Sequence, residues 1–307
     1  MLTLELNHLR KQYKNKVAVA DLSLKMEEGV YGLLGANGAG KTTLLRMLCD
    51  ILKPTSGSVL CNGVQIREMG GEYRRMLGYL PQDFGYYPEM KAERYLRYLA
   101  ELKALPPELI GSKTEELLHM VELYEVRNKK IKTFSGGMLR RLGIAQAMLN
   151  DPEILILDEP TAGLDPKERI RFRNIISSFS RNRIVILSTH IVSDVEYIAD
   201  RILLMKQGEL ILQGNLSQIT EKIQGCVWEC TAEGRQAQEL NERYAISNLR
   251  NCGDKVNLRI VAEEKPTKDA LPAEPNLEDV YLYYFAMNNC GTYNRRDRYE
   301  TDERGIV

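Results

Sequence analysis

The sequence predicts an α/β fold built on a buried sheet. Two continuous apolar runs of strand length, within EILILDEP (153–160) and RIVILSTHI (183–191), are typical of parallel strands covered on both faces. Residues 30–52 read as a strand, a glycine-rich turn and a helix. Residues 91–125 are rich in Ala, Leu, Glu and Lys at helical spacing, with breaks expected at Pro106, Pro107 and Gly111. These patterns predict an α/β core with a mostly helical insert.

The remaining elements of the first two thirds follow in order. Before residue 30, short segments in which apolar and polar residues alternate indicate strands. A turn and a short strand follow the first helix and end near residue 63. The stretch MLGYLPQDFGYYPEM indicates a strand and then an aromatic loop, while residues 138–150 carry a helical pattern. RILLMKQGELILQG reads as a hairpin that turns at Gln207-Gly208.

The character of the sequence changes near residue 216. WECTAEG and KVNLRIVAE indicate strands of a small α+β unit, a polar Pro-containing linker follows, and NLEDVYLYYFAM indicates a short helix. We therefore expect a large domain over 2–215, a small accessory or dimerisation domain over 216–290 and a disordered tail over 291–307.

Composition excludes several classes of protein. Hydrophobic residues make up 44% of the 307 residues and charged residues 27%, which rules out wholesale disorder and a fibrous chain. Equal numbers of basic and acidic residues, 42 of each, speak against a dedicated nucleic-acid binder. No apolar run approaches the roughly 18 residues of a membrane helix, and the N-terminus lacks a secretory signal, so we expect the chain on the cytoplasmic side.

The six cysteines include no C-x-x-C pair. Their spacings match no familiar zinc pattern, and in a chain without a signal the expectation is reduced, buried thiols.

Residues 35–42, GANGAGKT, fit the phosphate-loop pattern G-x-x-x-x-G-K-[ST]. Phosphate oxygens must meet several backbone N–H groups, and glycines permit both that approach and positive φ angles. A helix starting near Lys41 would direct its N-terminal dipole at the anion. Lys41 can reach the β- and γ-phosphates, and Thr42 can offer its hydroxyl to Mg²⁺. The pattern indicates a nucleoside triphosphate site.

The apolar strand 154–157 ends in two carboxylates, Asp158 and Glu159. Asp158 stands where it could hold Mg²⁺, directly or through water, and Glu159 could polarise an attacking water. Alone the pair could be an ordinary strand end, but beside a phosphate loop it favours triphosphate chemistry.

Further motifs follow in a characteristic order. Ser135 precedes Asp158 by 23 residues, and His190 follows it by 32. The motifs are Gln82 in YLPQDF, Ser135-Gly136-Gly137 in FSGGMLRRLG, Ala162-Gly163-Leu164-Asp165, and His190 in LSTHI. With them, residues 2–215 closely resemble the ATP-binding subunit of an ABC transporter, and NLEDVYLYYF resembles the ending of such subunits in ABC-2-type exporters.

The resemblance implies a P-loop NTPase fold: a RecA-like mixed sheet core, an antiparallel β subdomain and a helical insert at about 84–150. It implies catalytic roles for Glu159, His190 and Gln82, and Mg²⁺ contacts from Thr42, Gln82 and Asp158. The residues that it assigns to ATP are Tyr13, Gly35, Asn37, Gly38, Ala39, Gly40, Lys41, Thr42 and Thr43 in one chain, and Ser135, Gly136 and Gly137 acting on the partner's ATP. Ser135 and the glycines would begin a helix whose N-terminus meets that γ-phosphate.

Some positions depart from the pattern or stay open. Phe134 and Met138 stand where Leu and Gln are commonest around the signature motif, yet Ser135 and both glycines remain. Tyr13, placed for adenine stacking, could be an ordinary surface aromatic. The aromatic residues after Gln82 could line a groove for a helix of the membrane subunit, or pack inside the helical insert.

We therefore expect an ATP-hydrolysing subunit, bound peripherally at the cytoplasmic face of the membrane, that powers a separate membrane permease, with export favoured by the subgroup resemblance. With one phosphate loop per chain, it must pair with a second ATPase subunit, expected as a homodimer, although a heterodimer also fits. The alternatives are a soluble ABC-type ATPase in translation or DNA repair and a non-hydrolysing regulatory subunit, against which Glu159 and His190 argue.

Overall fold

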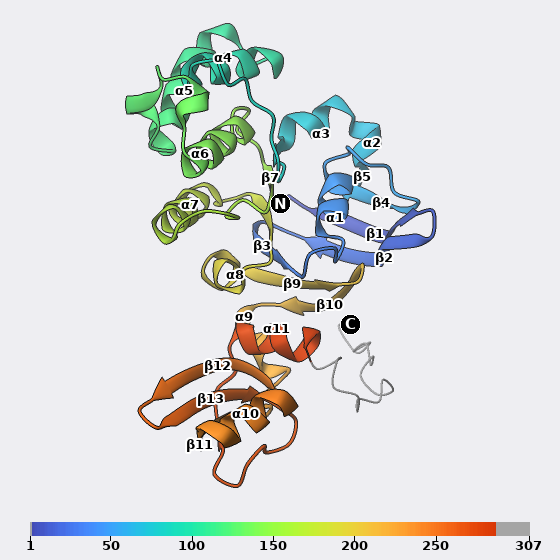
Figure 1. Cartoon of the computed structure of the whole chain (residues 1–307). Helices are drawn as coiled ribbons and strands as arrows, with labels where there is room; N and C mark the ends of the chain where they lie inside the picture. Colours follow the sequence, from blue (N-terminus) through green and yellow to red (C-terminus); the bar gives the residue numbers. More distant parts are fainter. Residues whose placement is uncertain (1, 287–307) are drawn as a thin grey trace. The chain divides into compact units, whose positions relative to one another are not determined.

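The computed structural model describes residues 2–286, and the chain forms two compact units, Met1–Ile219 and Thr220–Val307 (Figure 1). The tail predicted to be disordered, 291–307, lies outside the described residues.

The centre of the first unit is a six-stranded sheet, and five of its neighbouring strands are parallel. Side by side they are β10 (Glu209–Gly214), β9 (Arg201–Lys206), β3 (Gly29–Leu34), β8 (Ile184–Thr189), β7 (Ile154–Asp158) and β6 (Leu77–Leu80). Every residue of β7 and β8 is buried, which confirms the prediction made from their apolar runs. The antiparallel hairpin β9–β10 turns at Gln207 and Gly208, whose positive φ angles of 52° and 89° suit a tight turn.

An antiparallel sheet of four strands forms the second layer of this unit. Its strands, in spatial order, are β2 (Lys16–Met26), β1 (Leu4–Tyr13), β4 (Ser56–Cys61) and β5 (Val64–Gln65). Helix α1 (Lys41–Leu48) shares one hydrophobic core with both sheets: Leu6 comes from the antiparallel sheet, Leu45 from the helix and Ile156 from the central sheet. This core fixes the N-terminus of α1 at the edge of the central sheet.

Helix α8 (Val192–Ile198) packs against the same central strand, β3. A Cβ on Gly32 would stand 2.5 Å from a methyl carbon of Val195, so only glycine allows this close approach. The next residue, Leu33, belongs to the core shared with α1. Since neighbouring strand residues point to opposite faces, α1 and α8 cover the two faces of the sheet.

The helical insert follows β6 and precedes β7 in the chain, and its helices α4, α5 and α6 lie together in Figure 1. It contains α4 (Ala92–Leu102), α5 (Pro107–Met120), the short 3₁₀ turns η1 (Tyr124–Val126) and η2 (Ile131–Thr133), and α6 (Gly136–Ala147). Pro106 and Pro107 start α5, where a missing N–H costs nothing. The predicted break at Gly111 is wrong, because Gly111 lies inside α5, whose buried Ile110, Leu117 and Leu118 hold it to the insert.

Three helices complete the first unit. They are α2 (Ile66–Met69), α3 (Gly71–Met76) and α7 (Pro166–Phe179). The Asp165 side chain caps α7 by accepting a hydrogen bond from the Glu168 backbone N–H at 2.9 Å. Helix α9 (Leu216–Glu221) leads out of the unit.

The second unit is a small α+β domain. Its antiparallel sheet has the order β12 (Ala245–Cys252), β13 (Lys255–Val261), β11 (Val227–Glu233) and β14 (Leu271–Pro272), with helices α10 (Gly234–Arg243) and α11 (Leu277–Phe285). The predicted strands correspond to β11 and β13, and the predicted terminal helix to α11. Sequence reasoning missed α10 and β12, because α10 buries only Ala237 and Leu240 and β12 is mostly exposed.

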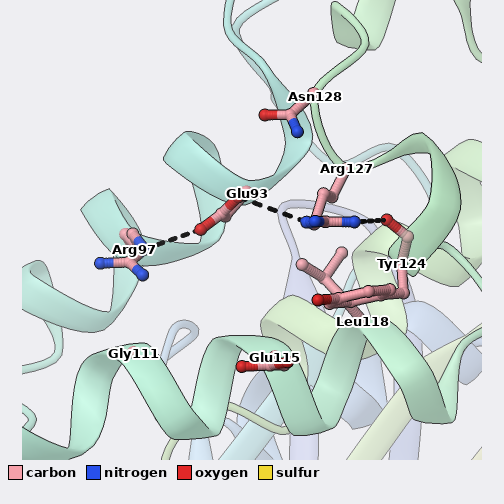
Figure 2. Close-up of a pocket in the computed structure, with 8 residues that line it drawn as sticks. All are labelled: Glu93, Arg97, Gly111, Glu115, Leu118, Tyr124, Arg127 and Asn128. Atoms are coloured by element: carbon pink, nitrogen blue, oxygen red, sulfur yellow. Dashed lines mark hydrogen bonds and ion pairs between the residues drawn. The ribbon is translucent and has the colours of Figure 1, made fainter.

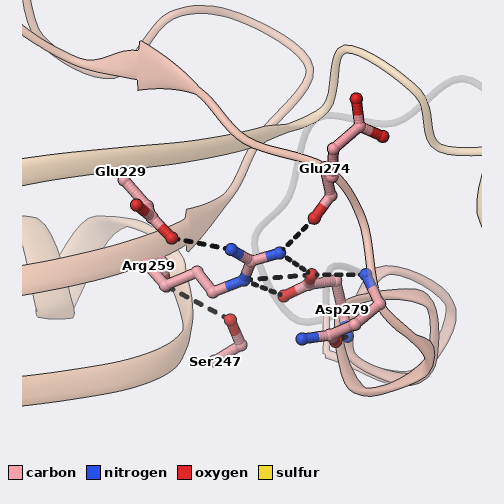
Figure 3. A network of polar contacts seen from close by, with 6 residues as sticks. Glu229, Ser247, Arg259, Glu274 and Asp279 are labelled. Carbon is pink, nitrogen blue, oxygen red and sulfur yellow. Dashed lines mark hydrogen bonds and ion pairs between the residues drawn. The ribbon is translucent and has the colours of Figure 1, made fainter.

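Arg259 ties α11 to this sheet (Figure 3). Its guanidinium donates to Asp279 Oδ2 at 2.7 Å and to Glu229 Oε1 at 2.8 Å. Asp279 is completely buried, and its carboxylate also accepts a hydrogen bond from the Asn276 N–H within the capping box of α11. A buried carboxylate with this many donors holds the helix in one position.

No described helix is long and apolar enough to cross a membrane.

Candidate nucleotide site

Four neighbouring parallel strands deliver the predicted site residues to one edge of the central sheet. Strand β3 leads into the loop that begins at Gly35, β8 leads to His190, β7 to Glu159, and β6 to Gln82. Because the carboxyl ends of parallel strands meet at the same edge, residues far apart in sequence converge there.

The loop at 35–40 is held against the fold so closely that only glycine fits at its two ends. A Cβ on Gly35 would lie 2.4 Å from the Met205 carbonyl oxygen, and one on Gly40 would lie 2.2 Å from that of Ala18. Gly40 and Gly38 also have positive φ angles, 108° and 82°. Ala39 is buried, whereas Asn37 and Gly38 are exposed at the tip. The loop is thus a bare backbone surface in front of α1, as phosphate binding requires.

Lys41 begins α1 and folds back under the loop. Its ammonium donates to the carbonyl oxygen of Gly35 at 2.6 Å and lies 3.3 Å from Glu159 Oε1. Thr42 and Thr43 are half-buried in the first turn of α1. The Lys41 ammonium therefore lies beside Gly35, which the sequence also assigns to ATP, and beside the predicted catalytic carboxylate Glu159.

Asp158 and Glu159 are organised by a residue that sequence reasoning missed, Ser188. The Ser188 hydroxyl donates to Asp158 Oδ1 at 2.6 Å, and it also accepts from the Glu159 backbone N–H at 3.0 Å. The signal in the sequence is a serine at the end of the apolar run of β8, where a buried hydroxyl needs partners.

Glu159 stands apart from ordinary strand residues because its φ angle is 49°. Non-glycine residues in this left-handed region are uncommon and often occur at functional sites. Its carboxylate lies between Lys41 and His190, whose Nδ1 is 2.9 Å from Glu159 Oε2. The Glu159 side chain is 7% exposed and that of His190 44%, so the histidine forms the open side of this cluster.

Gln82 lies in the exposed loop after β6. Its backbone carbonyl accepts a hydrogen bond of 2.6 Å from Arg140 of α6, a contact that no sequence motif indicated.

Ser135, Gly136 and Gly137 occupy the N-terminus of α6, as predicted. The Ser135 hydroxyl accepts from the Met138 N–H at 3.2 Å and caps the helix. Space around Gly136 is open, whereas a Cβ on Gly137 would approach Glu168 of α7 to 2.9 Å. In this single chain the motif is an exposed helix N-terminus separate from the contacts that join Lys41, Glu159 and His190.

Tyr13 is 45% exposed at the end of β1, and the Lys11 ammonium lies 5.2 Å from its ring centre. It pairs with Lys16 across the β1–β2 turn, and the carbonyl of Ala18 in the same hairpin touches the Gly40 position. The hairpin that carries Tyr13 therefore borders the phosphate loop.

The aromatic residues after Gln82 include one that packs inside the helical insert, whereas the groove for a membrane-subunit helix stays a prediction. Phe84 packs on α6, where a Cβ on Gly143 would lie 2.9 Å from its ring. Tyr87 is 51% exposed, with ring centres of Tyr95 and Tyr98 at 6.3 and 5.8 Å. Phe134, the residue just before Ser135, is buried as well.

A separate cavity of about 220 Å³ lies within the helical insert (Figure 2). Glu93 bridges its two arginines, at 3.2 Å from Arg97 and 3.8 Å from Arg127, and the Arg127 guanidinium covers the Tyr124 ring. The predicted site residues do not line this cavity.

The site fits a magnesium ion bound together with phosphates. Asp158 Oδ2 is buried and has no hydrogen-bond partner among the described residues, which leaves one carboxylate oxygen for a cation. The residues described here hold no cluster of three or more His, Cys, Asp or Glu suited to a metal. Mg²⁺ needs no such cluster, because it is commonly bound by one or two carboxylates together with substrate phosphates.

Residues 19–162 match the family model for the ABC transporter. An uncharacterized ABC transporter ATP-binding protein of Bacillus subtilis (strain 168) is 36% identical over 80% of this chain and 82% of its own length. The chain belongs to the ABC transporter ATP-binding proteins. It is therefore an ABC ATPase that binds and hydrolyses ATP, and the reading as a soluble ATPase of translation or DNA repair is not favoured.

Two further comparisons extend this likeness. The Nod factor export ATP-binding protein I of Rhizobium etli is 30% identical over 92% of this chain and 93% of its own length. A solved dimeric ATP-binding cassette in a post-hydrolysis state, bound to ADP and Pi, is 26% identical with a TM-score of 0.63, covering 69% of this ABC ATPase and 98% of that chain.

Proposed function

We propose that this ABC ATPase powers a separate membrane permease that exports its cargo, and that it works at the cytoplasmic face of the membrane. The observation that carries the ATPase part is the contact of Glu159 with both Lys41 and His190 beside the phosphate loop. Export is supported by the likeness to the Nod factor export protein over nearly the whole chain.

Different residues contact the phosphates, the adenine and the Mg²⁺ of ATP. The loop backbone at 35–40 and Lys41 hold the phosphates, and Thr42 and Thr43 extend this contact at the start of α1. Tyr13 stacks on the adenine. Thr42, Asp158 and Gln82 hold Mg²⁺, which when bound neutralises phosphate charge.

Glu159 is the general base, and its carboxylate accepts a hydrogen bond from the attacking water. The γ-phosphate competes with Glu159 for Lys41, so ATP binding frees the carboxylate to polarise water. His190 then supports the γ-phosphate from the open side, and Ser188 keeps Asp158 and Glu159 oriented. The burial of Glu159 strengthens each of these interactions.

A second copy completes each site. The exposed N-terminus of α6, with Ser135, Gly136 and Gly137, binds the γ-phosphate of the partner's ATP. Helix termini with open N–H groups are suited to this, and the open space at Gly136 leaves room for it. Hydrolysis breaks the bond between the β- and γ-phosphates, and release of the inorganic phosphate removes the shared anion and lets the pair separate, a binding-coupled change of shape.

The test is to tag the chain in its native cells, solubilise the membranes gently and identify what co-purifies. A stoichiometric multi-spanning membrane protein supports the proposal and supplies the permease. A Lys41→Ala chain serves as the matched sample for contacts that depend on ATP. Recovery from the soluble fraction alone, with ribosomes, DNA or nothing, contradicts the transport role while leaving the ATPase chemistry in place.

A further inference from the structure

Strand β6 and the loop after it run along helix α6 in a continuous line. A Cβ on Gly78 would lie 2.4 Å from the Ala147 carbonyl oxygen. Nearer the helix N-terminus, Gly143 leaves room for Leu80 and Phe84, whose atoms would stand 2.7 and 2.9 Å from a Cβ there. Leu80 and Phe84, which flank Gln82 in the sequence, therefore both pack against Gly143 of α6.

Arg140 continues this line by one helical turn. Its guanidinium donates to the carbonyl oxygen of Gln82 at 2.6 Å, so the loop is held at its centre as well as at its flanks. The arginine is half-buried, and burial lowers its pKa, while Asp83, Asp158 and Glu159 act in the opposite direction.

The same helix begins at the signature motif. Ser135 caps α6 only five residues before Arg140, which is about one and a half helical turns. Arg140 thus lies in the twelve-residue helix that Ser135 caps, and the turns of this helix are joined by backbone hydrogen bonds. A displacement of the Gln82 loop that Arg140 and Gly143 transmit would reach the N-terminus that faces the partner's ATP.

We propose that Arg140 is a positioning residue that couples the Gln82 loop to the signature end of α6, so that nucleotide at one site sets how α6 presents Ser135 to the partner. This inference rests on the proposed roles of Gln82 and Ser135. It adds a specific residue pair, the Arg140 guanidinium and the Gln82 carbonyl, as the physical link. A planar, permanently charged donor is well suited to hold one backbone acceptor through such a movement.

The test compares Arg140→Gln with Arg140→Lys, each in the full chain. We expect Arg140→Gln to lower kcat about tenfold while the KM for ATP changes less than about threefold, since the loop that binds phosphate is intact. In a Glu159→Gln background, Arg140→Gln should raise the ATP concentration needed for dimerisation by about tenfold. Arg140→Lys keeps a cationic donor and should recover most of both properties.

Arg127→Gln is the matched control. Arg127 also donates to a backbone carbonyl inside the helical insert, that of Tyr124 at 2.9 Å, but it lies away from Gln82. Gly143→Ala is an independent test, because its added methyl wedges Leu80 and Phe84 off the helix without changing a charge. It should reproduce the loss in dimerisation, with thermal melting showing that the variant is folded.

The proposal is overturned if Arg140→Gln leaves kcat and dimerisation unchanged, or if Arg127→Gln lowers them equally. It is also overturned if Gly143→Ala melts normally and dimerises normally. These readouts use the purified chain, so they are independent of whether a permease is found. Full turnover by Glu159→Gln would instead remove the proposed catalytic assignment and leave the Arg140 measurements interpretable through KM and kcat alone.

Discussion

The Lys41 ammonium lies 3.3 Å from Glu159 Oε1, and both side chains are almost completely buried. The lysine proposed to hold the phosphates therefore pairs with the carboxylate proposed to polarise the attacking water. Such a buried pair is stable only as a pair, because removing one partner leaves the other charge without compensation. On the proposed function, a γ-phosphate that enters the loop would compete for Lys41 and leave Glu159 paired with His190.

Glu159→Gln is expected to separate ATP binding from hydrolysis. Glutamine keeps the shape of the side chain but cannot take the water's proton, so kcat should fall by about 10²- to 10⁴-fold. Lys41 no longer pairs with a carboxylate, so ATP affinity should stay the same or rise. Phosphate release and equilibrium binding of a fluorescent ATP analogue measure the two effects.

Glu101→Gln, on the exposed surface of α4, is the control for a lost surface charge. It should hydrolyse ATP at the normal rate. If Glu159→Gln turned over ATP at that same rate, the assignment of the base would be wrong.

Gly40→Ala and Gly38→Ala should differ although both glycines have positive φ. A methyl group at Gly40 meets the Ala18 carbonyl at 2.2 Å, whereas nothing lies within 4 Å of one at Gly38. Gly40→Ala should abolish measurable ATP binding, and Gly38→Ala should weaken it by no more than about thirtyfold through backbone strain of ~1–2 kcal/mol. Equal losses in a titration would show that strain, and not the close approach, governs the loop.

Ser188→Ala should destabilise the fold and slow hydrolysis together. The variant leaves the buried Asp158 Oδ1 without its hydroxyl donor, at a cost of ~1–3 kcal/mol, while the Glu159 N–H keeps the Ser188 backbone carbonyl at 3.1 Å. Urea unfolding measures the first effect and steady-state phosphate release the second. Ser180→Ala removes an exposed serine hydroxyl instead, and a loss of equal size there would show that the two bonds of Ser188 contribute nothing specific.

Arg259→Gln should destabilise the second unit by ~3–5 kcal/mol, because it leaves the completely buried Asp279 without its cation. Thermal unfolding measures the loss. Adding Asp279→Asn in the same chain removes the uncompensated charge and should recover part of it. No recovery would mean that the arginine acts through its packing.

The motifs could be predicted from the sequence because each occupies a strand end or a helix start. Gly35, Asp158 and His190 follow apolar runs, and the order of parallel strands then brings them together. The contact between Lys41 and Glu159 could not be predicted, since it depends on the left-handed backbone of Glu159 and on how α1 packs between two sheets.

Residues that act through the backbone leave weaker signals. Arg140 reads as one of several surface arginines until its hydrogen bond to the Gln82 carbonyl is seen. In the second unit, α10 and β12 were missed because a short amphipathic helix with two buried residues and an exposed edge strand carry little periodicity.

The proposed function requires that ATP is held between the loop of one chain and the signature motif of another. Mixing a Lys41→Ala chain with a Ser135→Arg chain tests it, because each is defective alone and the mixed pair contains one site with both parts intact. We expect the mixture to hydrolyse ATP clearly faster than the average of the two separate proteins. A rate equal to that average would contradict the shared site.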